Sequence, residues 1–308
     1  MNITATPRTP DRPGPGPMPD GMLKALDITI GRRISGLLLG DFRSPALGQG
    51  TELAQVRKYE PGDDVRKIDW NVTARMQEPH IRVDVGERVL TTWLVLDTSP
   101  SMTFGTADRR KADVAEGVAL ATAHISTRRG NRLGIVTFGG NVTHLIPPAQ
   151  GRPGLLNALR VLREEPQRDG SGATSLGPAI HNVARFGGWS RFVVVVSDFR
   201  GPRDWRPALV ELAGRHEVVC VEIRDPREQE LPDIGELWMV DPETGRHLRV
   251  DTSRRKLRER FASAAATDRA EVASIIGASG ARHVVLSTSG DWLRPFVAAI
   301  GGLKGALR

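Results

Sequence analysis

The chain has 308 residues, a net charge of +7, one cysteine and a hydrophobic share of 39%. This length fits one large domain or two small ones, and a single cysteine excludes both an internal disulfide and a Cys-rich zinc site. The sequence holds no unbroken apolar run of the roughly 20 residues that a membrane-spanning helix needs. Its N-terminus lacks the apolar core of a secretory signal, so we expect a cytoplasmic protein without a membrane span.

The basic charge raises the question of a nucleic-acid partner, because a clustered basic patch is typical of proteins of that class. Here the arginines are scattered along the chain, and aromatic residues make up only 5% of it. Side chains on which single strands stack are therefore scarce. We expect the charge to be solvated, and we expect no nucleic-acid partner.

Three segments follow one another along the chain. Residues 1–22 carry six prolines and should form a disordered tail, because such a composition buries no core. Residues 23–90 should form an N-terminal extension, and residues 91–308 the main domain. Within the extension we expect short helical pieces at 23–43, a strand at 51–59, a turn at 61–62 and a strand at 80–85.

The main domain alternates buried strands with helices. We expect strands in the segments TTWLVLD, RLGIVTF, RFVVVVSDF, EVVCVEI and ARHVVLST, helices at 108–129, 154–164, 176–186, 208–213, 253–276 and 291–300, and a hairpin at 237–250. Continuous β-branched runs are typical of strands that are buried on both faces. The alternation predicts an α/β fold with a doubly wound, mostly parallel sheet, whose ligands lie at the carboxyl ends of the strands.

Oxygen-bearing side chains follow two of these predicted strands. The first strand ends in the pattern Asp-x-Ser-x-Ser at Asp97, Ser99 and Ser101, and the run VVVVSDF carries Asp198 at the corresponding position. Thr174 lies in the loop GSGATSLG between them. Oxygen-only ligands suit a hard divalent cation, Mg²⁺ or Mn²⁺. The alternative for the pentapeptide alone is a helix N-cap, in which Asp or Ser satisfies free backbone N–H groups.

A known type of metal site has the same five positions. The set resembles the metal-ion-dependent adhesion site of von Willebrand factor A-type domains, through Asp97, Ser99, Ser101, Thr174 and Asp198. This resemblance implies that the hydroxyls approach the metal directly or through water and that the aspartates act mostly through waters. It also implies an open coordination position that accepts a carboxylate of another protein. On this resemblance we expect a non-enzymatic, metal-dependent protein-binding module.

A longer ordered string precedes this site. It begins as YEPGDDVRKIDW at 59–70, continues through Ala74-Arg75 and Glu87-Arg88, and runs into LDTSPSM. The string resembles the bacterial family called domain of unknown function 58, a von Willebrand A-like group. Members are often encoded near MoxR-type AAA+ ATPases and are thought to act as their adaptors or substrate-binding partners, so the resemblance implies such a partner. Many members carry transmembrane helices before this motif, whereas this chain does not, which supports a cytoplasmic form.

The segment from 59 to 87 combines a tight turn with interleaved charges. We expect Arg–carboxylate pairs that fix the segment on the sheet domain, with Trp70 as a buried hydrophobic anchor. The alternative, which can hold at the same time, is a face that binds a partner directly. The candidate residues for both roles are Tyr59, Asp63, Asp64, Arg66, Asp69, Trp70, Arg75 and Glu87.

An enzyme is the alternative function. An aspartate at the end of the first strand of such a sheet can act as a nucleophile, so Asp97 would serve a Mg²⁺-dependent hydrolase or phosphotransfer enzyme. Such enzymes resemble the pattern Asp-x-Asp, in which the second carboxyl is the acid/base. Here that position holds Ser99, which cannot act as a carboxylic general acid. We therefore expect no catalytic activity.

Overall fold

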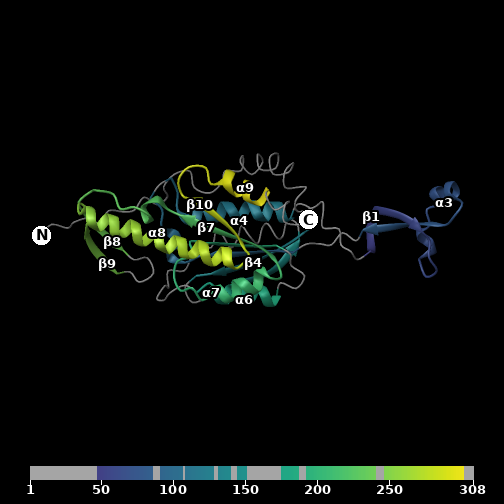
Figure 1. The fold of residues 1–308 in the computed structure, drawn as a ribbon, viewed down its shortest axis with the longest axis horizontal. Coiled ribbons are helices and arrows are strands. Elements are labelled where there is room, and N and C mark those ends of the chain that lie inside the picture. Colours follow the sequence, from purple (N-terminus) through teal and green to yellow (C-terminus); the bar gives the residue numbers. More distant parts are fainter. Residues whose placement is uncertain are drawn as a thin grey trace. The chain divides into compact units, whose positions relative to one another are not determined.

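A computed structural model gives the fold of the chain (Figure 1). It describes residues 47–85, 91–106, 108–127, 131–139, 144–150, 175–186, 192–240 and 246–301. These residues belong to two compact units: the smaller lies within Ser35–Val89, and the larger comprises the described residues from Thr91 onward. The expected tail at 1–22, the helical pieces at 23–43 and the helix at 154–164 lie outside the described residues.

The smaller unit is an antiparallel hairpin that carries two short helical segments. Its strands are β1, Leu47–Lys58, and β2, His80–Val85, which agree with the two strands predicted for this region. Between them come the 3₁₀ turn η1, Val65–Lys67, and the helix α3, Trp70–Met76. Helix α3 was not predicted, because seven residues are too few to show a helical periodicity.

The larger unit is built on a six-stranded sheet. Its strands are β3 (Thr91–Asp97), β4 (Arg132–Phe138), β5 (His144–Gln150), β6 (Phe192–Ser197), β7 (Glu217–Arg224) and β10 (Arg282–Ser287). The spatial order is β10-β7-β6-β3-β4-β5, and all neighbours are parallel except β4 and β5. The chain therefore runs from the central β3 to one edge, returns to the centre at β6, and continues to the other edge. This is the order of a doubly wound sheet, so the predicted fold class is confirmed.

Helices cover both faces of this sheet (Figure 1). They are α4 (Lys111–Thr127), α6 (Gly177–Phe186), α7 (Trp205–Ala213), α8 (Arg255–Ala278) and α9 (Leu293–Gly301). One face packs against α6, α7 and the end of α8 in a core that includes Trp93, Val195 and Ile276. Helix α4 packs on the other face. Trp292, next to α9, lies so close to α4 that a Cβ at Gly117 would meet its ring at 2.4 Å, so only glycine allows this packing.

The edge strand β5 was not predicted, because its sequence HLIPPAQ contains two prolines, which cannot donate ladder hydrogen bonds. Its position explains how the prolines are accommodated. The strand lies at the edge of the sheet, and its pairing with β4 shifts register so that Ile146 and Ala149 have partners while Pro147 and Pro148 do not. An edge strand with an irregular register tolerates proline where a central strand does not.

A second, separate hairpin precedes α8. Its strands are β8, Glu236–Val240, and β9, His247–Asp251, in agreement with the hairpin predicted at 237–250. Two further 3₁₀ turns, η2 (Pro100–Thr103) and η3 (Pro226–Glu228), follow β3 and β7. In the part of the chain that the structure describes, no helix combines the length and the apolar composition that crossing a bilayer requires.

Candidate metal centre

The candidate site lies where two neighbouring central strands end. β3 ends at Asp97 and β6 ends at Ser197, and the register pairs Leu96 with Val196 one residue earlier. Between these strands the direction of the sheet order reverses. In doubly wound sheets the connections diverge at this switch point, which is where ligands bind. The carboxylates of Asp97 and Asp198 therefore leave the sheet as neighbours.

The loop after β3 turns its polar side chains toward one another. The N–H of Ser99 donates to Oδ1 of Asp97 at 2.9 Å, and the hydroxyl oxygens of Ser99 and Ser101 are 3.0 Å apart. All three residues are buried. Ser99 occupies the N-cap position of η2, but its side chain makes no capping hydrogen bond. Helix capping, the alternative explanation of the pentapeptide, therefore does not account for the Ser99 hydroxyl.

The turn after β6 places Asp198 beside this loop. The Ser197 hydroxyl donates to Oδ2 of Asp97 at 2.5 Å and accepts a hydrogen bond from the N–H of Phe199 at 2.8 Å. Phe199 has a φ of 53°, a left-handed conformation that costs free energy in any residue but glycine. Its buried ring packs edge to face on Trp205, with centroids 5.4 Å apart. This packing holds the turn in the conformation that directs Asp198.

A buried lysine binds Asp198. The Nζ atom of Lys111, the first residue of α4, lies 2.6 Å from Oδ2 of Asp198 and 2.8 Å from Oε1 of Glu228 in η3. The Lys111 side chain is 0% exposed. A buried ammonium is tolerated only when it is paired and hydrogen-bonded. The bridge therefore ties the start of α4 to the connections that follow β6 and β7.

The two aspartates have different electrostatic surroundings. Burial, together with the nearby charge of Asp198, raises the pKa of Asp97 to about 7. Burial would also raise the pKa of Asp198, but the Lys111 ammonium and the hydrogen bonds to this carboxylate hold its pKa below the ordinary value. No cationic side chain of the described residues forms an ion pair with Asp97. Asp97 therefore lacks a cationic partner of the kind that Lys111 provides to Asp198.

The donor set fits a hard divalent cation. Two carboxylates and two hydroxyls offer only oxygen atoms, which Mg²⁺ prefers. Adjacent ligands of an octahedral ion with metal–oxygen distances of about 2.0–2.1 Å lie about 2.9 Å apart, and the hydroxyl oxygens of Ser99 and Ser101 are 3.0 Å apart. Within the described ranges no three His, Cys, Asp or Glu side chains form a metal-binding group. An ion at this site would therefore depend on the serines as well as on Asp97 and Asp198.

The end of β4 supports the loop after β3. Both the N–H and the hydroxyl of Thr98 donate to the carbonyl oxygen of Phe138, at 2.7 and 3.1 Å. The next residue is Gly139, where an added Cβ would lie 2.6 Å from the carbonyl carbon of Thr98 and 2.7 Å from the backbone nitrogen of Ser99. Only glycine permits this approach, so Gly139 helps to fix the loop that carries the serines.

Comparison with known proteins identifies the family. Residues 55–271 match the family described as "Protein of unknown function DUF58". The chain belongs to this family. Two relatives are the uncharacterized proteins Rv1480 of Mycobacterium tuberculosis (strain ATCC 25618 / H37Rv) and Mb1516 of Mycobacterium bovis. Each is 39% identical over 288 residues, which cover 92% of this chain and 90% of the relative.

Two solved structures are similar to this DUF58 chain at low identity. The conserved hypothetical protein BatB from Bacteroides thetaiotaomicron is 17% identical, and its alignment covers 71% of this chain and 98% of BatB with a TM-score of 0.48. The VWA domain of SpRpn10 is 14% identical, and its alignment covers 68% of this chain and 94% of that domain with a TM-score of 0.39. Both likenesses are weak, and the family assignment rests on the sequence match.

The part of the string from 59 to 75 lies in the smaller unit. Arg57 and Asp63 form a bidentate ion pair with nitrogen–oxygen distances of 2.8 and 2.7 Å. Asp69 accepts from the backbone N–H groups at the start of α3 and also pairs with Nε of Arg82 at 2.8 Å. These contacts lie within the unit, so they stabilise its own hairpin and helix. That the segment is fixed on the sheet domain stays a prediction.

Tyr59 and Asp64, two further candidate residues of the DUF58 string, have local contacts. Asp64 caps η1 by accepting a hydrogen bond from the backbone N–H of Arg66 at 3.0 Å. The N–H of Tyr59 donates to the carbonyl oxygen of Pro79 at 2.8 Å, next to the end of β1. The side chains of Arg66 and Arg75 are exposed. These contacts leave the two basic side chains available to a partner.

Trp70 does not serve as a buried anchor in this DUF58 unit. Its side chain is 71% exposed, so the smaller unit itself does not bury Trp70, and its burial against the sheet domain stays a prediction. Trp70→Ala should therefore lower the free energy of unfolding by less than about 1 kcal/mol, as surface substitutions do. Trp93→Ala is the matched control, because Trp93 is 1% exposed and its loss should cost about 3–5 kcal/mol. Chemical denaturation measures both variants, and equal losses would contradict the exposed position of Trp70.

Three residues of the site were missed by the sequence analysis: Lys111, Ser197 and Glu228. Ser197 had a local signal, because a hydroxyl directly precedes Asp198 at the end of a buried strand. Lys111 and Glu228 had none, since a lysine at a helix start and a glutamate in a turn are usually solvated. Two predicted residues, Thr174 and Glu87, lie outside the residues that the structure describes.

Proposed function

We propose that this DUF58 protein is a non-enzymatic module that uses Mg²⁺ or Mn²⁺ to bind an acidic side chain of a partner protein. Asp97, Ser99, Ser101 and Asp198 would hold the ion, with Thr174 as the fifth position of the adhesion-site resemblance. The observation that carries the proposal is the convergence of two carboxylates and two hydroxyls at the switch point of the sheet. A bound ion would supply positive charge and an open coordination position to a carboxylate.

The charge of the site supports a divalent cation. Asp97, Asp198 and Glu228 carry three negative charges when ionised, and the buried Lys111 supplies one positive charge to the last two. Arg200 adds only a partly exposed guanidinium, whose Nη1 lies 3.6 Å from Glu228. Like charges that are buried close together disfavour ionisation, and a divalent cation beside Asp97 would relieve this repulsion.

A MoxR-type AAA+ ATPase is the partner that we propose, with the protein acting as its adaptor in the cytoplasm. The support for this partner is membership of DUF58, whose members are thought to serve such ATPases. An ATPase surface that presents an aspartate or glutamate would satisfy the chemistry of the site. No feature of the described residues favours a hydrolase, since both Asp97 oxygens accept hydrogen bonds and Asp198 is bound by Lys111.

The test is the affinity of the full chain for a candidate ATPase, measured by titration in Mg²⁺ and in EDTA. The wild type should bind about tenfold or more weakly in EDTA, a difference of about 1.4 kcal/mol. Thr174→Ala should lose a similar factor in Mg²⁺ while its thermal melt stays close to that of the wild type.

Thr267→Ala is the matched control, because Thr267 is exposed on α8 and its hydroxyl donates a hydrogen bond to the carbonyl oxygen of Ser263 within the same helix. This variant should bind as the wild type does. Equal wild-type affinity in Mg²⁺ and EDTA, or a Thr174→Ala variant that matches the wild type, would refute metal-dependent capture.

A further inference from the structure

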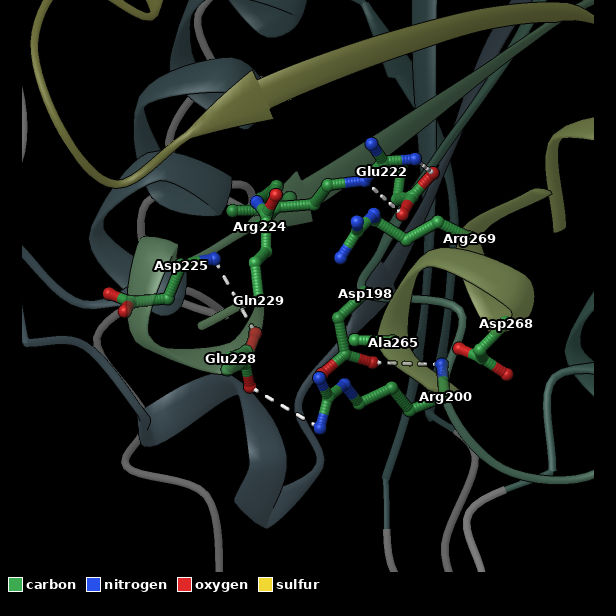
Figure 2. Close-up of a pocket in the computed structure, with 11 residues that line it drawn as sticks. Asp198, Arg200, Glu222, Arg224, Asp225, Glu228, Gln229, Ala265, Asp268 and Arg269 are labelled. Atoms are coloured by element: carbon green, nitrogen blue, oxygen red, sulfur yellow. Dashed lines mark hydrogen bonds and ion pairs between the residues drawn. The ribbon is translucent and has the colours of Figure 1, made fainter. Parts of the chain in front are cut away.

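A small pocket opens beside Asp198 at the carboxyl ends of β6 and β7 (Figure 2). Its lining comes from the connection after β6, the end of β7, η3 and the side of α8. Five of the lining residues are acidic and three are arginines. A pocket with this composition attracts a charged ligand, and the sign of that charge depends on which of the lining groups are still free to bind.

Three of the five acidic groups of the pocket are already bound within the protein. Asp198 and Glu228 share the Lys111 ammonium. Glu222 accepts hydrogen bonds from the Arg224 guanidinium and lies 2.7 Å from Nε2 of His283. A cationic ligand would therefore have to compete with internal ammonium, guanidinium and imidazole groups for these oxygens.

The two remaining acids are occupied as well. Asp225 accepts hydrogen bonds from the hydroxyls of Thr106 and Thr288 and from the backbone N–H of Arg227. Asp268 pairs with Arg203. Every acidic side chain of the pocket thus has internal donors, so none of the five offers an unused carboxylate to an incoming cation.

Two guanidinium groups of the pocket, unlike its acids, form no hydrogen bond within the described part of the protein. Figure 2 shows Arg200, from the connection after β6, and Arg269, from α8, extending toward the pocket. Nη1 of Arg200 lies 3.6 Å from Oε1 of Glu228. This distance is too long for a hydrogen bond. Among the described residues, no hydrogen bond or ion pair involves the half-buried Arg269 side chain. Both groups therefore have free N–H donors.

We propose that this pocket binds a carboxylate, the side chain of an aspartate or glutamate of a partner protein, between Arg200 and Arg269. Guanidinium groups hold carboxylates through paired, charge-assisted hydrogen bonds. A monovalent carboxylate suits the pocket better than a phosphate, because the five acids of the lining repel a second negative charge. Of the proposed metal ligands among the described residues, only Asp198 lines the pocket. Its carboxylate is bound by Lys111, and the inference rests on the two arginines, which belong to no part of the proposed metal site.

The test uses N-acetyl-glutamate methylamide, whose single charge is its side-chain carboxylate, and the full chain in EDTA. Binding is followed through the Nε–Hε NMR signals of the arginine side chains, assigned with the variants Arg200→Gln and Arg269→Gln. We expect the signals of both arginines to shift together and to saturate. Each variant should weaken binding by about fivefold or more, because one of the two charged donors is lost.

Three controls make the result decisive. The glutamine analogue of the probe should shift neither signal, and Arg294→Gln, which removes an exposed arginine near the start of α9, should leave the affinity unchanged. The titration is done in EDTA, so binding of the probe cannot require the proposed metal ion, which separates this pocket from the proposed metal site. Equal shifts with the two analogues, equal weakening by Arg294→Gln, or tighter binding of inorganic phosphate would each overturn the proposal.

Discussion

Replacing Lys111 with methionine should lower the free energy of unfolding by about 3–5 kcal/mol, the range for breaking a buried ion pair by removing one partner. Methionine keeps most of the side-chain volume, so the loss reports on the charge. The Lys111 side chain is 0% exposed, and its ammonium contacts both Asp198 and Glu228. Without it, both carboxylates lose their shared cation in a place that water reaches poorly.

Chemical denaturation measures this effect, and Lys256→Met is the matched control. Lys256 is exposed on α8, so its replacement should change the free energy of unfolding by less than about 0.5 kcal/mol. The double variant Lys111→Met/Asp198→Asn should recover part of the loss, because only the Glu228 carboxylate is then left without its cation. A single variant that costs no more than the Lys256 control would show that the bridge contributes little.

Asp97→Asn should stabilise the protein in EDTA at pH 8, by about 1–3 kcal/mol, because an amide at this buried site carries no charge to desolvate. The pKa of Asp97 rises from 3.8 to about 7 on folding, through burial and the charge of Asp198. Between these two values the folded protein binds more protons than the unfolded chain, so wild-type stability falls as the pH rises through this window. The advantage of the variant should therefore shrink from pH 8 to pH 5.

The same variant tests the metal. Adding Mg²⁺ at pH 8 should raise the melting temperature of the wild type, because a ligand that binds only the folded state stabilises it. It should leave Asp97→Asn almost unchanged. Glu271→Gln is the control for loss of a carboxylate, since Glu271 is exposed on α8. An equal response of wild type and Asp97→Asn to Mg²⁺, or a wild-type stability in EDTA that is flat between pH 5 and 8, would contradict this account.

Much of the fold was predictable from the sequence, because the signals are local. The run FVVVV is apolar throughout and forms most of β6, a central strand with both faces buried. The pattern around Asp97 was readable for the same reason, since its two serines lie within four residues of it along one loop. Short or irregular elements carried no such signal: α3 has only seven residues, and β5 contains two prolines.

The sequence by itself determined the strand pattern, the doubly wound class and the residues that end β3 and β6. Only the tertiary structure decided what surrounds them. Lys111 is 87 positions from Asp198 and 117 from Glu228, and no periodicity links such distant residues. They meet because α4 packs across the sheet and because parallel strands bring their carboxyl ends to one edge. The same packing buries the charged groups of Lys111 and Asp97. Burial determines how strongly these charges affect the free energy of unfolding, and no single position of the sequence encodes it.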